Sequence, residues 1–416
     1  MKKLLVIGYV WPEPNSSAAG SRMLQLLEIF QQQDYQISYA SPALESEHRF
    51  KLDSLGISEV SIELNNSSFD EYVKSLQPDV VLFDRFMMEE QFSWRVDKVC
   101  PDAVKLLEAV DLHCLRDARQ TAVKNNLNAT DINQLQLQTD IAIREVASIL
   151  RCDLSLMISD VEVKVLKDIF NVPDDLLLYL PFMYESLDKT ESKEKWPGFN
   201  EREHFVTIGN FRHAPNWDSV LYLKNNIWPL IHSKIKTAEL HIYGSYLPKK
   251  AQQLHNPEQG FYIKGWADDA LQTLSQYRVC LSPLRFGAGM KGKLADAMLT
   301  GTPSVTTLIG AESMHADYEW PGLIEDNNEK LVEAAISLYE NEKIWKEKQH
   351  NIFAIVNDVF NKQQNESKFI KKINTIMNEL DAHRNNNFAG KMLRHHTMKS
   401  SMYMSQWIEA KNKLKQ

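Results

Sequence analysis

The sequence predicts an α/β fold built from two parallel sheets. Short apolar segments alternate with longer amphipathic segments along most of the 416 residues. This rhythm restarts once, at residues 204–209, after a polar and charged stretch that contains Pro197 and Gly198. Alternating strands and helices form parallel sheets with right-handed crossovers. The polar stretch is typical of an interdomain hinge, so we expect two domains of this kind.

The elements can be placed approximately from apolar periodicity. In the first half we expect strands near residues 4–8, 36–40, 60–64, 79–83, 104–108 and 154–158, and helices near 21–33, 69–76, 133–150 and 161–170. In the second half we expect strands near residues 204–209, 239–243, 261–263, 278–281 and 304–306, and a mainly helical pattern from about Ile336 onward.

Composition narrows the class of protein. Apolar residues make up 44% and charged residues 25%, which is enough for a sizeable core. The net charge of −8 argues against a general nucleic-acid binder. Four scattered cysteines without a C-x-x-C pair indicate reduced thiols in a cytosolic protein, not a disulfide framework or a zinc site. The first apolar run is too short for a signal peptide, and no run approaches the ~20 residues that span a bilayer. We expect a cytoplasmic protein that is at most peripheral on the inner face of the membrane.

The last segment, residues 381–416, differs in charge from the rest of the chain. It carries seven Lys and Arg residues against two acidic ones, a local net charge of +5. Residues 400–415 include Met402, Met404, Trp407, Ile408 and Leu414, which could form one face of an amphipathic helix. Two interpretations stay open: a helix docked on the body of the protein, or a contact with an anionic membrane or a lipid-linked substrate.

The glycine-rich segment 282–298 is the most informative motif. A predicted strand leads into a loop with Gly287, Gly289 and Gly292, and a helix is expected to begin near Lys291. A helix start offers free backbone N–H groups and partial positive charge, and glycines let a ligand approach the backbone. Arg285, Lys291 and Lys293 add full charges. The loop therefore predicts a site for a phosphorylated ligand, with Asp296 available for sugar hydroxyls.

Other polar or small residues follow predicted strands, on the side of a parallel sheet where ligands collect. They are the loop 8–22 with Gly20 and Ser21, His113 with Asp111 and Arg116, Arg212 in the loop after residue 208, and two turns with Tyr243–Gly244 and Gly265–Trp266. The first loop lacks G-x-G-x-x-G, which disfavours a dinucleotide site. The chain also lacks H-E-x-x-H, D-x-D, G-x-S-x-G and a P-loop. We therefore predict neither a bound metal nor a cofactor.

Four stretches together resemble the retaining GT-B glycosyltransferases of the broad family four group. They are GNFRHAPNWDSV, IKGWADD, LSPLRFGAGMKGKLADAMLTGTPSVTTLIGAES and VDLHCLR. The resemblance covers about residues 1–380. It implies two Rossmann-like domains facing each other across a cleft, a metal-independent transfer of sugar from a nucleotide sugar, and an acceptor that is a glycan, a lipid-linked molecule or a protein. The domains implied are residues 1–184 for the acceptor, a linker 185–203, residues 204–380 for the donor, and a tail 381–416 that crosses back to the first domain.

The resemblance also implies roles for individual residues. Lys291 and Arg212 would contact the diphosphate, with Arg285 as a weaker candidate, and His113 would lie near the transferred sugar. The remaining donor contacts implied are Gly20, Ser21, Tyr243, Gly244, Gly265, Trp266, Gly287, Gly289, Met290 and Asp296.

One position departs from the family pattern. The family has an E-x7-E motif, whereas this chain has Ala288 at the first position and Asp296 at the second. The donor sugar and the retaining or inverting outcome therefore stay open. Two alternatives stay open as well: a nucleotide-sugar epimerase of the same fold, which would need no acceptor, and a non-catalytic GT-B subunit that scaffolds a partner enzyme.

Overall fold

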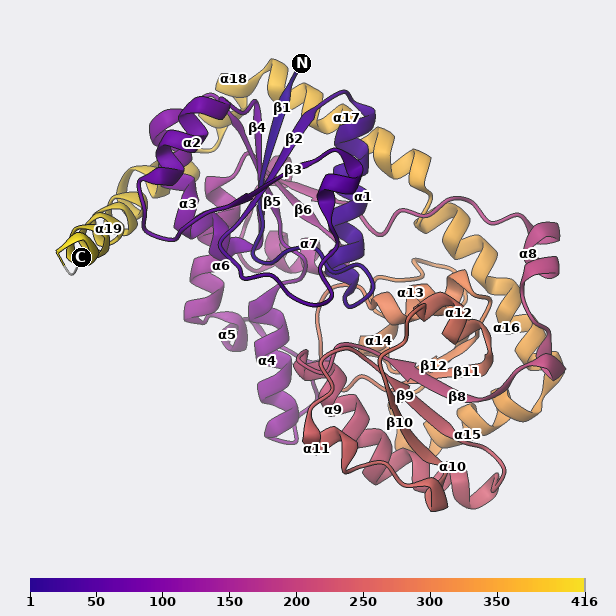
Figure 1. The fold of residues 1–416 in the computed structure, drawn as a ribbon. Helices are drawn as coiled ribbons and strands as arrows, with labels where there is room; N and C mark the ends of the chain where they lie inside the picture. Colours follow the sequence, from indigo (N-terminus) through magenta and orange to yellow (C-terminus); the bar gives the residue numbers. More distant parts are fainter. Residues whose placement is uncertain (415–416) are drawn as a thin grey trace.

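The computed structural model describes residues 1–414; for Lys193 and residues 396–398 it describes the backbone alone. It contains two parallel sheets, seven-stranded in the order β3-β2-β1-β4-β5-β6-β7 and six-stranded in the order β10-β9-β8-β11-β12-β13. In Figure 1 the first sheet lies above the second. The predicted α/β fold with two parallel sheets is confirmed.

The first sheet and its helices occupy the N-terminal half. The strands are β1 Lys3–Ile7, β2 Gln36–Ser41, β3 Ser58–Ser61, β4 Val80–Asp84, β5 Val104–Glu108, β6 Leu154–Met157 and β7 Leu177–Tyr179. The helices are α1 Ala18–Gln32, α2 Ser68–Leu76, α3 Phe86–Val99, α4 His113–Lys124, α5 Gln134–Leu137, α6 Asp140–Arg151 and α7 Asp160–Asp168. Alternate residues of β1 enter different buried clusters, Leu5 and Ile7 on one face and Leu4 and Val6 on the other, because helices cover both faces of the sheet.

The second sheet repeats this plan. Its strands are β8 Glu203–Ile208, β9 Leu240–Tyr243, β10 Phe261–Gly265, β11 Tyr277–Ser282, β12 Ser304–Thr306 and β13 Gly322–Ile324. Its helices are α9 Ala214–Tyr222, α10 Trp228–Lys234, α11 Lys249–Gln252, α12 Ala270–Ser275, α13 Gly292–Leu299, α14 Leu308–Ala311, α15 Asn328–Glu340 and α16 Glu342–Ala354.

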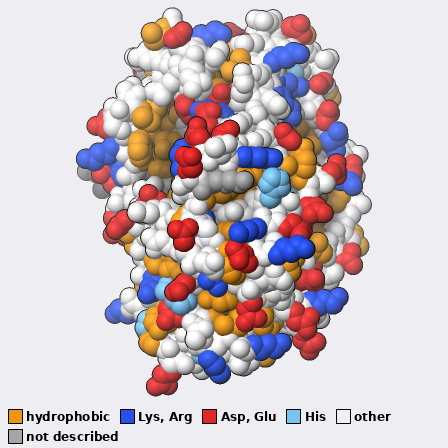
Figure 2. All heavy atoms as spheres, turned by 90° about the vertical axis from the view of Figure 1, so that its right-hand side faces the viewer, with side chains coloured by type: hydrophobic (Ala, Val, Ile, Leu, Met, Phe, Trp, Pro, Cys, Tyr) orange, Lys and Arg blue, Asp and Glu red, His pale blue; other side chains and the backbone are white. Residues whose placement is uncertain are grey.

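The chain crosses between the halves twice. The first crossing follows β7 and includes α8, Lys189–Lys195. The second leads from α16 into α17, Lys362–Asn378. The two crossings lie side by side, because the Tyr184 N–H donates to the Phe360 carbonyl at 2.8 Å and the Lys362 N–H donates to the Tyr184 carbonyl at 3.0 Å. On the side of α8 and α16, acidic and basic side chains are interspersed (Figure 2).

The C-terminal helices return to the first domain, and they do so earlier than residue 381. Phe369, Ile373 and Ile376 of α17 are buried in the core under β1 and α1. Helix α18, Leu380–Asn386, and helix α19, Phe388–Lys413, continue along that domain (Figure 1). The predicted helical tail is thus present to Lys413, although residues 415 and 416 lie outside the described chain. Nowhere in the described chain is a helix both long and apolar enough to cross a bilayer.

Some elements differ from the sequence-based expectations. Strand β3 begins two residues before the predicted 60–64, and the single helix predicted at 133–150 is broken into α5 and α6. The break occurs because the Thr139 hydroxyl accepts from the Ala142 N–H and starts a new helix. Helices α3 and α4 and strands β7 and β13 were not predicted.

Candidate functional site

The loop between β11 and α13 lies against strand ends of the N-terminal domain. Gly289 has φ +62°, and a Cβ on it would lie 2.9 Å from the Asp111 Cβ and 3.1 Å from the Val110 carbonyl oxygen. A Cβ on Gly292 would lie 2.4 Å from the Ala18 Cβ. Glycine is therefore needed at both positions for close contact between the domains. The predicted glycine loop does lie at the domain interface.

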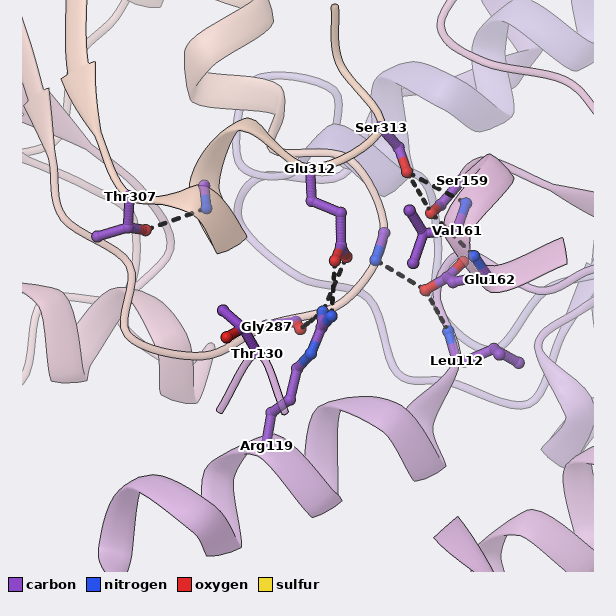
Figure 3. A network of polar contacts seen from close by, with 12 residues as sticks. Leu112, Arg119, Thr130, Ser159, Val161, Glu162, Gly287, Thr307, Glu312 and Ser313 are labelled. Carbon is purple, nitrogen blue, oxygen red and sulfur yellow. Dashed lines mark hydrogen bonds and ion pairs between the residues drawn. The ribbon is translucent and has the colours of Figure 1, made fainter. Parts of the chain in front are cut away.

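A network of polar contacts fixes this loop from the N-terminal domain (Figure 3). Arg119 of α4 donates to the Gly287 carbonyl at 2.9 Å and to both carboxylate oxygens of Glu312 at 2.8 and 2.6 Å. The Glu162 carboxylate of α7 accepts from the Gly289 N–H at 2.7 Å and from the Leu112 N–H at 2.9 Å.

Two lysines stand at the start of α13. Lys291 is 7% exposed, and its Nζ donates to the Gly289 carbonyl at 2.7 Å. The Nζ of Lys293 donates to the Asn216 Oδ1 at 2.9 Å. Burial lowers the pKa of each to about 8. Lys291 is buried and Lys293 is half-buried, and neither forms an ion pair within 4.0 Å among the described residues, although the charges of Glu312, Glu162 and Asp111 act on Lys291 from further away.

The N-terminal wall of the site contains His113, the first residue of α4. Its Nε2 lies 3.4 Å from the Asp111 Oδ1, and Arg116 forms an ion pair with the same carboxylate. Burial lowers the pKa of His113 to about 4, so the ring is neutral at physiological pH. Across the interface, burial likewise lowers the pKa of His213 to about 4, and the charges of Asp111 and Arg116 reach it. The two imidazoles thus belong to one electrostatic environment.

Arg212 and Arg285 have other partners. The Arg212 guanidinium lies 3.6 Å from the centre of the Tyr246 ring, and the Tyr246 hydroxyl donates to Glu13 at 2.6 Å. Arg212 is thus placed at the rim of the interface. Arg285 is paired with Asp218 of α9 (Nε to Oδ2, 2.9 Å), so its charge already has a partner.

Gly20 and Ser21 brace the loop that precedes them. The Gly20 N–H donates to the Ser17 hydroxyl at 3.2 Å, and the Ser21 hydroxyl donates to the Pro14 carbonyl at 2.9 Å. The same loop contacts the C-terminal domain through Ser16, whose hydroxyl lies 2.8 Å from that of Ser245. The loop faces the other domain as predicted, and the contacts come from its earlier residues.

The turns with Tyr243–Gly244 and Gly265–Trp266, which the resemblance implies as donor contacts, lie at the edge of the second sheet. The Gly244 N–H donates to the Gly265 carbonyl at 2.7 Å, and the Tyr243 hydroxyl lies 2.9 Å from that of Tyr277. Trp266 stacks on His48 of the N-terminal domain, with ring centres 4.1 Å apart and planes at 7°. An aromatic pair therefore bridges the domains at this edge.

Met290 and Asp296 face inward. Met290 is buried in one cluster with Ile158 of the N-terminal domain. Burial raises the pKa of Asp296 to about 7.

Several residues of the site had no assigned role in the sequence-based prediction. Two of them, Lys293 and His213, lie within motifs that the sequence indicated. Lys293 was noted only for its charge, and a residue-by-residue reading of these motifs could have assigned a role to both. Glu312 lies near the end of the third quoted stretch, where it had no assigned role. Arg119 and Glu162 come from helices with no local motif, so the convergence of the three residues depends on the tertiary structure.

A protein-family model matches most of the second domain. Residues 202–341 match the protein-family model described as "Glycosyl transferases group 1". None of the curated proteins matches the sequence of the chain at a significant level.

Solved structures match almost the whole chain. Sucrose-phosphate synthase from Thermosynechococcus elongatus is 14% identical with a TM-score of 0.66, covering 90% of this chain and 99% of that chain. A variant of TarM from S. aureus, in complex with fondaparinux, alpha-GlcNAc-glycerol and UDP, is 10% identical with a TM-score of 0.68, covering 90% and 100%. HepE from Anabaena, in complex with UDP and glucose, is 11% identical with a TM-score of 0.66, again covering 90% and 100%. The chain therefore has the GT-B fold, residues 202–341 are similar to the glycosyl transferases of group 1, and the prediction of a glycosyltransferase is confirmed.

Proposed function

We propose that the chain transfers a sugar from a nucleotide-diphosphate sugar to a hydroxyl of an acceptor, without a metal ion. The observation that carries the proposal is the pair Lys291 and Lys293, two desolvated cations with no carboxylate within 4.0 Å among the described residues. Buried charges are normally paired, so this arrangement favours an anionic ligand. A diphosphate at the start of α13 would supply the missing charge and would also meet the free N–H groups of the helix.

The reaction follows from that placement. The bond between the anomeric carbon and the β-phosphate oxygen breaks, a bond to the acceptor oxygen forms, and the proton of the acceptor hydroxyl passes to an oxygen of the leaving diphosphate. Negative charge develops on the β-phosphate, where Lys291 and Lys293 would stabilise it; one preorganised donor of this kind contributes ~3 kcal/mol. His113 is neutral and lies beside Asp111, which suits orientation of the donor sugar and not proton abstraction. We propose retention of configuration on the basis of the family resemblance.

The donor would be a nucleotide sugar and the acceptor a glycan or glycoconjugate. Two neighbours of the same fold are described with UDP, and one of them also with glucose, which makes UDP-sugars the first candidates. Arg212 could reach the diphosphate from its position over Tyr246 at the rim.

We also propose that the protein works on the cytoplasmic face of the membrane, in contact with anionic lipid through α19. Tyr403 and Trp407 are 62% and 58% exposed on this helix, and the Lys411 ammonium lies 5.0 Å from the Trp407 ring. Aromatic side chains flanked by lysines suit the boundary between headgroups and acyl chains. Sedimentation with vesicles tests this: binding to anionic vesicles and not to neutral ones supports it, and equal recovery in the supernatant with both contradicts it.

The test of the enzymatic proposal is a panel of nucleotide sugars, assayed for release of the nucleoside diphosphate with and without candidate acceptors. We expect acceptor-dependent release for one donor, a loss of about 100-fold or more in Lys291→Ala, and no change in the control Lys249→Ala, an exposed lysine on α11. Isomerised donor without acceptor would indicate the epimerase instead. No nucleotide-induced rise in Tm with any nucleoside diphosphate would indicate the scaffold subunit.

A further inference from the structure

The polar network of Figure 3 joins the donor loop, defined as residues 287–291, to the N-terminal domain. We propose that Arg119 and Glu162 are positioning residues, which fix the donor loop from across the interface so that Lys291 is held in place when the domains are closed. The inference rests on the proposed function, because it assigns Lys291 to the diphosphate.

Arg119 contacts the loop at its beginning. It is 5% exposed, and its Nη1 donates to the Gly287 carbonyl at 2.9 Å. The same guanidinium grips Glu312 through two parallel hydrogen bonds, a geometry that fixes orientation as well as distance. Glu312 follows α14, so one arginine of the N-terminal domain connects two loops of the C-terminal domain.

Glu162 contacts the loop in its middle. It is fully buried, and one carboxylate oxygen accepts the N–H groups of Leu112 and Gly289, one from each domain. Burial, together with the charge of Asp111, raises the pKa of Glu162 to about 8. The contact to Gly289 therefore does not require a negative charge, and a neutral side chain with an oxygen acceptor can replace the carboxyl.

The contact at Gly289 leads directly to Lys291. The Gly289 N–H donates to Glu162, and the Gly289 carbonyl accepts from the Lys291 Nζ at 2.7 Å. The left-handed backbone of Gly289 and its close approach to Asp111 leave little space for another loop conformation. A hydroxyl pair at 2.6 Å, Ser159 with Ser313, joins the domains beside this contact. The position of Lys291 thus depends on groups that belong to the other domain.

The experiment compares Glu162→Ala with Glu162→Gln, by hydrogen exchange of the Gly289 amide in the ligand-free protein and by kcat. In Glu162→Ala we expect exchange about tenfold faster and kcat about tenfold lower, because the amide loses its acceptor. In Glu162→Gln we expect both values to return close to those of the wild type, since the amide oxygen can accept the same bond. The control is Arg384→Ala in α18, which breaks the two-bond ion pair between Arg384 and Asp153, away from the donor loop. Hydrogen exchange of the Gly289 amide and kcat in this variant should match the wild type.

A charge swap separates positioning from simple attachment. The double variant Arg119→Glu with Glu312→Arg restores an ion pair between the domains but removes the donor to the Gly287 carbonyl. We expect kcat to stay low. Recovery of kcat in the swap would show that Arg119 only ties the domains together, and unchanged Gly289 exchange in Glu162→Ala would overturn the role of Glu162.

The two proposals fail in different ways. If the wild type transfers no sugar from any donor, the proposed function fails, while the exchange of Gly289 still reports whether Glu162 fixes the loop. If Glu162→Ala does not fold, Arg119→Lys keeps the charge and loses the two-bond geometry. In Arg119→Lys we then expect faster exchange of the Gly289 amide and a lower kcat. Wild-type values of both would overturn the proposal.

Discussion

Replacing Lys291 by methionine should raise stability and abolish activity, and these opposite signs make it the most revealing substitution. Methionine has a similar length and no charge. In the ligand-free protein the ammonium is desolvated, and its hydrogen-bond acceptor is the Gly289 carbonyl of its own loop. Removing the charge therefore removes a cost of folding, whereas the proposed reaction loses the cation that stabilises the leaving diphosphate.

The size of the effect follows from the pKa of Lys291. Burial lowers it from 10.5 to about 8, and at about 1.4 kcal/mol per pKa unit the charged form costs the folded state about 3 kcal/mol. The lost bond to the Gly289 carbonyl offsets about 1 to 2 kcal/mol of this. We expect a net gain of about 1 to 2 kcal/mol in the free energy of unfolding, and a kcat lower by about 100-fold or more.

The pH dependence provides an independent check on the sign. Between pH 8 and 10.5 the unfolded lysine keeps its proton while the folded one loses it, so the unfolded state binds more protons. The stability of the wild type should therefore gain from this group as the pH rises through that window, and the gain should be missing in Lys291→Met. Urea unfolding at pH 7 and pH 10 measures both. The charges of Glu312, Glu162 and Asp111 offset only part of the cost of burying Lys291. A variant that is less stable than the wild type at pH 7 would refute this account.

Three further substitutions test neighbouring parts of the site. Gly289→Ala should lower kcat at least tenfold and also lower Tm, because alanine is strained at φ +62° and its Cβ would lie 2.9 Å from the Asp111 Cβ, forcing the domains apart. Small-angle scattering of the ligand-free variant would show a larger radius of gyration. His113→Asn should lower kcat about tenfold. The shape of the pH profile of kcat between pH 5.5 and 8 should stay unchanged, since His113 with a pKa of about 4 is already neutral there. A lost inflection in that range would show that the histidine titrates during turnover. Arg285→Ala should retain most of its activity in the donor panel, because Arg285 is paired with Asp218, and a loss comparable to that of Lys291→Ala would restore it as a diphosphate ligand.

The parts of the fold that the sequence predicted well are those with strong local signals. Strands such as β5, Val104–Glu108, are continuous buried runs and were placed within a residue. Helix α4 shows why other elements were missed. Its N-cap residue, Leu112, makes no side-chain cap, and the first N–H groups of the helix, from His113 and Cys114, are instead accepted by Glu145 at 2.8 and 2.7 Å. A cap supplied from a distant helix leaves no signature in the local sequence.

The same distinction applies to the site. The glycine loop and Lys291 follow from local chemistry, because a strand, a flexible turn and a basic helix start predict an anion site wherever they occur together. The interdomain contacts of Arg119 and Glu162 do not, because each residue lies in an ordinary amphipathic helix. The pairing of Arg285 also depends on a partner, Asp218, from another helix. Sequence reasoning finds the groups that could bind a ligand and not the contacts that orient them.

Ala288 connects these observations. The family pattern has a carboxylate here, yet Ala288 is 8% exposed and belongs to the apolar cluster of the N-terminal domain, together with Ala109 and Leu112. A glutamate at this position would place an unpaired charge within that cluster, near the carboxyls of Asp111 and Glu162, at a cost of several kcal/mol. The small apolar side chain therefore allows the loop to pack against the other domain, and Arg119 and Glu162 then hold the backbone on either side of it. In this chain the position that carries a donor contact in the family pattern forms part of the domain interface, so under the proposed function other groups, with His113 of the opposite wall among them, would orient the donor sugar.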